Sequence, residues 1–167
     1  MSDLKIPPPA KGDHVEISYE ADTGFICVTM VGRLEAADAI LLMDTITSYL
    51  TIYLGRIEPY YILVDVRLAD GLSAEARKAF ADSDKSNADV QANTGPRRLA
   101  IFGGSFAFRS FATMLLTTLK VAQFAARTAN VDVPAGGEWN FEANETAARA
   151  WLADQRRADG ARTAKTQ

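Results

Sequence analysis

The chain has 167 residues, a length that suits a single domain. Its 18 basic and 21 acidic residues leave a formal net charge of -3, and 48% hydrophobic with 23% charged residues is the balance of an ordinary soluble globular protein. The single cysteine, Cys27, and the single histidine, His14, exclude an intramolecular disulfide and a Cys/His zinc site, so we expect neither metal nor cofactor. They also disfavour histidine-based catalysis, which favours a binding protein over an enzyme.

The charge pattern predicts no nucleic-acid partner, because the basic doublets are limited to Arg97-Arg98 and Arg156-Arg157. The longest stretch without a charged residue is eleven residues, Thr45 to Gly55, whereas a transmembrane helix needs about 20. Three prolines, and no apolar stretch, follow the first residues, so no secretory signal is expected. These features predict a cytoplasmic protein without a transmembrane segment, and a free thiol fits that compartment.

The first elements in chain order form a predicted hairpin. Residues 1–13 are rich in proline, and we expect a flexible tail there. Apolar and polar residues alternate over 15–20, which predicts a half-buried strand. A second strand is predicted over 25–31, and the short turn at 21–24 favours antiparallel pairing of the two.

Helices and strands then alternate. Apolar residues recur at helical spacing over 36–54, and the run 60–66 has the composition of a buried strand. Asp70-Gly71 is predicted to turn, and Ser73 to cap a helix ending near residue 87.

The last third of the chain predicts a strand over 98–102 with an exit at Gly103-Gly104, and then a long helix over 105–127. A short strand at 138–141 and a helix capped by Asn144 follow. The segment 158–167 is small and polar, so we expect a disordered tail and a domain over 14–157.

The resulting order, β-β-α-β-α-β-α-β-α, predicts an α/β fold with a mixed, mostly parallel sheet and flanking helices. The run from Val28 to Ala39, an apolar strand followed by Gly-Arg-Leu-Glu and an Ala-rich helix start, resembles the second strand and first helix of STAS domains. Ile62–Asp65 followed by Gly71-Leu72 resembles the next segment of that family. Phe141 with Glu145–Leu152 resembles the closing helix of its SpoIIAA-like branch.

STAS domains include anti-sigma-factor antagonists and the cytoplasmic domains of sulfate transporters, and the SpoIIAA-like branch is grouped with lipid-binding CRAL-TRIO folds. The resemblance therefore implies a regulatory or binding module. In the phosphorylatable antagonists a serine precedes Gly-Leu, whereas here Ala69-Asp70 precede Gly71-Leu72 and Ser73 follows. A phosphorylation switch at Ser73 is one alternative, and a plain helix N-cap is the other.

The predicted helix 105–127 has only a narrow polar stripe, although a helix covering a sheet needs an apolar stripe of only about 100°. Its excess apolar surface could pack against the helix 36–54, form a homodimer interface, or line a pocket for an apolar, lipid-like ligand. The residues that we expect at this interface or pocket are Phe106, Phe111, Met114, Leu115 and Leu119.

The corner between strand 98–102 and this helix is a second candidate site. Gly103, Gly104 and Ser105 could hold an anionic ligand against free backbone N–H groups, with Arg109 as counter-charge. The alternative is a tight turn with an N-cap, and a third hypothesis makes Ser105 the nucleophile of a small hydrolase or transferase. Our leading hypothesis is a non-enzymatic binding or regulatory module that contacts a protein partner or an apolar ligand.

Overall fold

The computed structural model of the protein describes residues 6–53, 59–86, 97–105, 108–110, 113 and 138–166. Six strands in this part of the chain form one sheet, and their order in space is their order in the sequence. The pairings of β1 with β2 and of β2 with β3 are antiparallel, and the three pairings that follow are parallel. The strands are β1 (Ala10–Lys11), β2 (Val15–Glu20), β3 (Phe25–Leu34), β4 (Tyr60–Leu72), β5 (Arg97–Phe102) and β6 (Glu138–Glu142).

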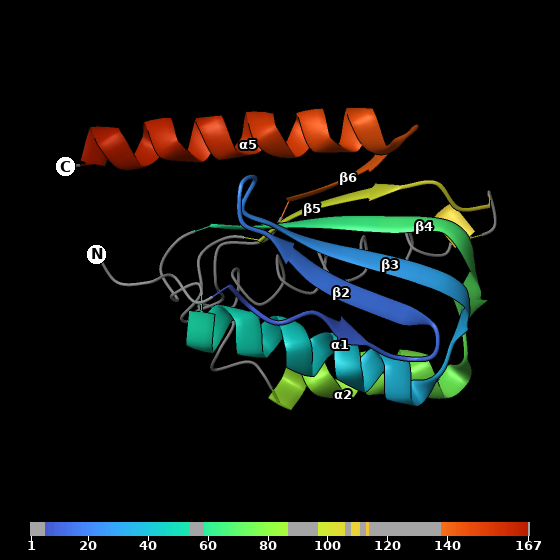
Figure 1. Ribbon diagram of the computed structural model, residues 1–167. Coiled ribbons are helices and arrows are strands. Elements are labelled where there is room, and N and C mark those ends of the chain that lie inside the picture. Colours follow the sequence, from blue (N-terminus) through green and yellow to red (C-terminus); the bar gives the residue numbers. More distant parts are fainter. Residues whose placement is uncertain are drawn as a thin grey trace, which may run out of the picture.

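Helices lie on both faces of the sheet (Figure 1). α1 (Ala36–Ser48), continued by the π-helix η1 (Tyr49–Tyr53), and α2 (Ala74–Ser86) cover one face. α5 (Glu145–Thr166) crosses the other face, over β4, β5 and β6. None of these described helices combines the length and the hydrophobicity needed to cross a membrane.

The alternation of strand side chains produces a separate apolar cluster on each face. The face under α1 and α2 buries one set of strand residues, among them Ile17, Ile26 and Val64. The intervening residues point to α5 and form a smaller cluster with it, made of Phe25, Tyr61, Leu63, Ala100, Phe102, Ala148 and Leu152. The two layers of helices are therefore held by independent sets of contacts.

The predicted α/β class and mostly parallel sheet are confirmed, as are the hairpin and the order of the described elements. Asn144 caps α5 as predicted, because its Oδ1 accepts a hydrogen bond of 3.0 Å from the Ala147 N–H.

Both predicted tails differ from the structure. Residues 10 and 11 form β1, and the Tyr49 hydroxyl donates a hydrogen bond of 2.6 Å to the Pro8 carbonyl. A two-residue strand is too short to show any alternation, which is why the sequence pattern missed it. At the other end, α5 continues to Thr166 where a disordered tail was expected from residue 158. Its alanines and arginines are good helix formers, although they show no apolar periodicity.

The predicted turn at Asp70-Gly71 is also wrong, because β4 continues to Leu72. Its register against β3 shifts twice, between Thr29 and Val31 and between Gly32 and Arg33, with one extra β4 residue each time. Such bulges bend a strand without ending it, so the Asp-Gly pair marks a bulge rather than a turn.

Two glycines are required where β5 ends. Gly103 and Gly104 have φ angles of +83° and +79°, a region that other residues rarely adopt. A Cβ on Gly103 would lie 2.9 Å from the Arg67 Cα, so the chain here approaches β4 too closely for any side chain. Gly160 on α5 is different, because a Cβ there would meet no atom within 4 Å.

Replacing these glycines by alanine should therefore have opposite effects. We expect Gly103→Ala to lower the free energy of unfolding by about 1–3 kcal/mol, since it combines backbone strain with a clash against Arg67. We expect Gly160→Ala to raise it by about 0.5–1 kcal/mol, since alanine stabilises an open helical position. Urea denaturation of both variants measures the two changes, and equal destabilisation of both would contradict this assignment.

Candidate functional site

The Gly103-Gly104-Ser105 corner is arranged as a turn with an N-cap. The Ser105 Oγ accepts a hydrogen bond of 3.2 Å from the Phe108 N–H, and Phe108 is buried in the core under α1. The Arg109 guanidinium is engaged elsewhere, donating a 3.1 Å hydrogen bond to the Glu142 carbonyl of β6 and lying 5.7 Å from the Phe141 ring centre. This arrangement favours the turn-and-cap interpretation over an anion site with Arg109 as counter-charge.

Ser73 is likewise an N-cap. Its side-chain oxygen accepts a 3.0 Å hydrogen bond from the Ala76 N–H, and its own N–H donates to the Leu34 carbonyl at 3.0 Å. The residue is 3% exposed, so a kinase could reach the hydroxyl only if the start of α2 opened. The geometry favours the capping alternative over the phosphorylation switch.

The remaining predicted site residues, Phe106, Phe111, Met114, Leu115 and Leu119, lie outside the described residues. The apolar pocket and the homodimer interface expected for this segment therefore stay predictions.

A groove that the sequence pattern did not indicate lies between α5 and the β2–β3 turn. Its volume is about 650 Å³. Ala150 and Ala153 project from α5 into it, and because their side chains are small they leave the space open. We call it the α5 groove, and it is lined by Thr23, Phe25, Arg149, Ala150, Ala153, Asp154, Arg156 and Arg157.

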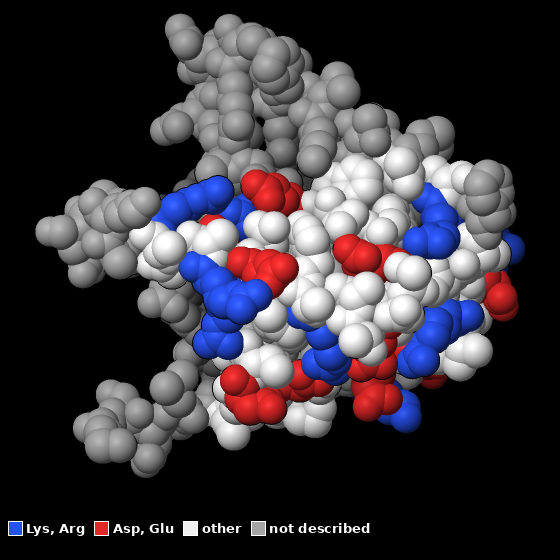
Figure 2. All heavy atoms as spheres, turned by 90° about the horizontal axis from the view of Figure 1, so that it is seen from above, with Lys and Arg blue, Asp and Glu red and all other residues white. Residues whose placement is uncertain are grey.

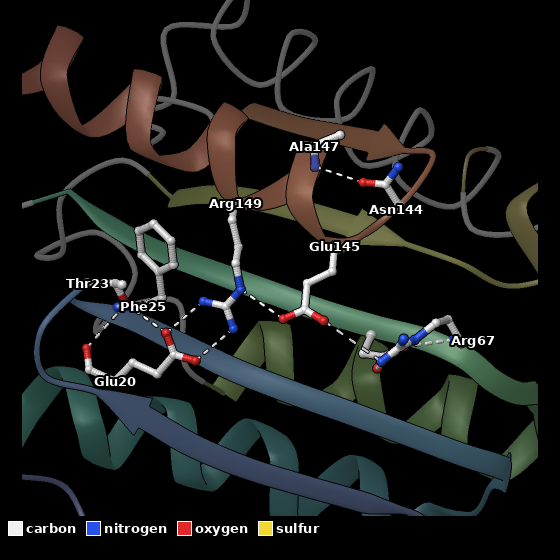
Figure 3. A network of polar contacts seen from close by, with 9 residues as sticks. Glu20, Thr23, Phe25, Arg67, Asn144, Glu145, Ala147 and Arg149 are labelled. Atoms are coloured by element: carbon white, nitrogen blue, oxygen red, sulfur yellow. Dashed lines mark hydrogen bonds and ion pairs between the residues drawn. The ribbon is translucent and has the colours of Figure 1, made fainter.

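One end of the α5 groove is built by a chain of ion pairs that runs from β2 to β4 beneath the start of α5 (Figure 3). Arg149 donates to both carboxylate oxygens of Glu20, at 2.7 and 2.8 Å, and to Glu145 at 2.8 Å. Glu145 in turn lies 3.9 Å from Arg67, which is paired with Asp65 at 2.6 Å. These contacts fix the first turns of α5 to strands that are distant in sequence.

The same ion pairs shift the protonation of their neighbours. The hydrogen bonds from Arg149 lower the pKa of the Glu20 carboxyl to about 2, so Glu20 is ionised at neutral pH. Burial, and then the adjacent Glu20, raise the pKa of the Cys27 thiol to about 12. Cys27 thus stays protonated at neutral pH and is a poor nucleophile.

The other end of the groove carries the Arg156-Arg157 doublet. Arg157 is paired with Asp154 on the same helix, whereas Arg156 donates to the Thr23 carbonyl, which carries no formal charge. Among the described residues, no carboxylate lies within ion-pair distance of Arg156. Acidic and basic side chains are otherwise interspersed over the α5 face, around an area without charge (Figure 2). Within the described part of the chain, no three His, Cys, Asp or Glu side chains are grouped to hold a metal ion.

Comparison with known proteins identifies the fold. The sequence matches no protein-family model and no curated protein. The structure is similar to the crystal structure of a Shewanella loihica protein, described as an uncharacterized member of the DUF3478 family with a SpoIIAA-like fold. The similarity covers 86% of this chain and 98% of that one, with a TM-score of 0.50 and 22% sequence identity. The protein therefore has the SpoIIAA-like fold that the sequence motifs predicted.

The groove residues were missed because their partners are far away in the sequence. Arg156 and Arg157 were noticed only as a basic doublet, and Arg149 and Glu20 are 129 residues apart. One signal was available, because α5 spaces Ala150, Ala153, Asp154 and Arg157 along one face of a helix.

The Glu20–Arg149 pair should make stability depend on pH. Because the pKa of Glu20 falls from about 4.5 when unfolded to about 2 when folded, its stabilising effect is complete above pH 4.5 and disappears as the pH falls to 2. Allowing for partial solvent screening, we expect this effect to be about 1 kcal/mol at pH 7. The Glu20→Gln variant should be less stable than the unmodified chain by that amount at pH 7, and equally stable at pH 2, in urea denaturation.

Arg149→Gln serves as the matched variant, because it removes the other partner of the same pair. It should flatten the pH dependence in the same interval. A slope between pH 4.5 and 2 that is unchanged in both variants would show that Glu20 does not depend on Arg149.

Proposed function

We propose that this protein is a non-enzymatic binding module and that the α5 groove is the surface on which a partner docks. The observation that carries the proposal is the groove itself, with an apolar floor and a rim guanidinium, Arg156, that no described carboxylate neutralises. Pockets that combine an apolar lining with a few fixed polar groups are typical of binding sites.

Four of the described side chains that could take part in catalysis have structural roles or an unsuitable protonation state. The hydroxyls of Ser73 and Ser105 cap helices, and the Cys27 thiol is protonated at neutral pH. Glu20 is held ionised by Arg149, so it is a weak base. This distribution supports binding in preference to hydrolysis or group transfer.

The occupant that fits the groove is a polypeptide segment of a partner protein that presents an acidic side chain beside an apolar one. The carboxylate would meet Arg156, whose present partner is a neutral carbonyl. The apolar side chain would fill the space that Ala150 and Ala153 leave open next to Phe25. Electrostatic complementarity of this kind selects a partner and fixes its register more than it adds affinity.

A library of 12-residue peptides displayed on phage tests the proposal. Peptides selected on the full chain should be enriched in Asp or Glu next to an apolar residue. Fluorescence anisotropy with one selected peptide should then show about tenfold weaker binding to Arg156→Glu and to Ala153→Glu, because each places a negative charge in the groove.

Lys78→Glu on the exposed side of α2 is the control, because it makes the same change of charge as Arg156→Glu, and a larger one than Ala153→Glu, on the opposite face of the molecule. It should bind the peptide like the unmodified chain. Circular dichroism of all three variants checks that they are folded. The proposal fails if the selected peptides have no acidic preference, or if the groove variants bind as tightly as the control.

A further inference from the structure

A second polar cluster lies between the far end of α5 and the sheet. The Arg98 guanidinium donates to both oxygens of the Asp159 carboxylate, from Nε at 3.1 Å and from Nη2 at 2.8 Å. The Tyr61 hydroxyl donates to the same carboxylate at 3.2 Å. The Arg98 and Asp159 side chains are only 4% and 6% exposed, so the carboxylate is enclosed by donors and removed from water.

The two hydrogen-bond donors belong to the sheet, and the acceptor belongs to α5, where the exposed Arg162 also lies 3.5 Å from the Asp159 carboxylate. Tyr61 and Arg98 are paired across β4 and β5, so their side chains stand side by side on the α5 face. Glu138 pairs with Arg98 across β5 and β6, and its carboxylate lies 3.7 Å from the guanidinium. Burial, and then Asp159, raise the pKa of Tyr61 to about 12, which keeps its hydroxyl protonated as a donor. The positions of Tyr61 and Arg98 are therefore set by the pairing of the strands and do not require α5.

Besides Asp159, the far end of α5 is attached through Arg156, which donates an exposed hydrogen bond to the Thr23 carbonyl. Among residues 153–162, Asp159 is the one buried side chain, and among residues 145–162 the last buried apolar side chain is Leu152. Gly160, next to Asp159, weakens the helix at this point. A buried ion pair gives less net stability than the same area of apolar contact, because both charges lose their hydration. The last turns of α5 therefore belong to the less stable part of the molecule.

We propose that Arg98 and Tyr61 form a carboxylate-binding site on the sheet, which α5 closes with its own Asp159 and which accepts an external carboxylate when the end of α5 moves away. The ligand class is a carboxylate, either free in solution or on an acidic side chain of another protein. The site is distinct from the α5 groove, but Arg156 and Arg157 of the groove lie on the same end of α5, so opening the site also changes the groove. When the site is open, the Arg98 guanidinium keeps one carboxylate neighbour, the half-exposed Glu138. Because Arg98 lies mostly out of contact with water, binding a second carboxylate remains favourable.

Chemical rescue tests the site. Asp159→Ala removes the internal carboxylate and should lower the melting temperature. Sodium acetate should restore part of this loss with a saturable, millimolar midpoint, whereas sodium chloride at the same ionic strength should not. Asp159→Ala combined with Arg98→Lys should lose the rescue, because lysine cannot bind a carboxylate through two parallel hydrogen bonds. If Asp159→Ala does not fold, Asp159→Asn is measured in the same way.

A second measurement on the unmodified chain separates an exchangeable site from a purely structural ion pair. We expect acetate to compete with Asp159, so hydrogen exchange of the amides at 155–166 should become at least about fivefold faster in acetate than in chloride, while β4 is unaffected. A Gly-Gly-Glu-Gly-Gly peptide with an acetylated N-terminus and an amidated C-terminus, so that its one carboxylate is the Glu side chain, is the second probe. If the peptide accelerates hydrogen exchange at lower concentrations than acetate does, the ligand is an acidic side chain. If acetate acts at lower concentrations than the peptide, the ligand is a free carboxylate.

The proposal is overturned if neither probe changes the exchange of α5 and acetate stabilises Asp159→Ala no more than it stabilises the unmodified chain. In that case the Arg98–Asp159 pair only fixes the position of the helix.

Discussion

α5 is attached to the sheet by ion pairs at its start and near its far end, with an apolar contact between them, and the surface features of that face depend on this attachment. Arg149 holds the first turns to Glu20, Leu152 packs in the middle, and Asp159 holds the far end to Arg98. Asp159 lies ten positions after Arg149, which corresponds to about 15 Å of helix. An apolar contact alone would let such an Ala-rich helix slide or rotate, whereas two bidentate pairs at this separation fix both its register and its rotation. That rotation directs Ala150 and Ala153 toward the β2–β3 turn, where they leave the groove open.

The two faces of the sheet differ in how their helices are held. Under α1 and α2 the main cluster is apolar, with residues such as Ile17 and Val28 fully enclosed, and the buried Asp38 accepts backbone hydrogen bonds and not an ion pair. Under α5 the apolar cluster is smaller and arginines and carboxylates surround it. Hydrophobic packing is insensitive to pH and to small ions, whereas ion pairs respond to both. The described ion pairs that join a helix to the sheet therefore make the α5 face the one on which we expect binding and pH to alter helix attachment.

The sequence was sufficient to predict the fold but not the candidate site, and the difference has a physical reason. The local pattern of apolar residues predicts strands and helices, and the segments at 15–20, 25–31 and 98–102 were recognisable in this way. Ion pairs have no local signal, since Arg98 and Asp159 are 61 residues apart. One clue was present in β5, where Arg98 adjoins a run that is apolar on both faces. An arginine at the start of a buried strand requires an anion, although the sequence does not say which one supplies it.

The far end of α5 was predicted to be disordered for the same reason that it can act as a reversible closure. From residue 153 onward the helix contains no large apolar side chain, so neither periodicity nor apolar burial specifies its place. Its position depends on the exposed hydrogen bond from Arg156 to Thr23 and on Asp159, whose attraction to Arg98 is opposed by the loss of hydration of both charges. An attachment of this kind is specific in geometry and small in net free energy. These are the two properties that allow another carboxylate to replace it without disturbing the rest of the fold.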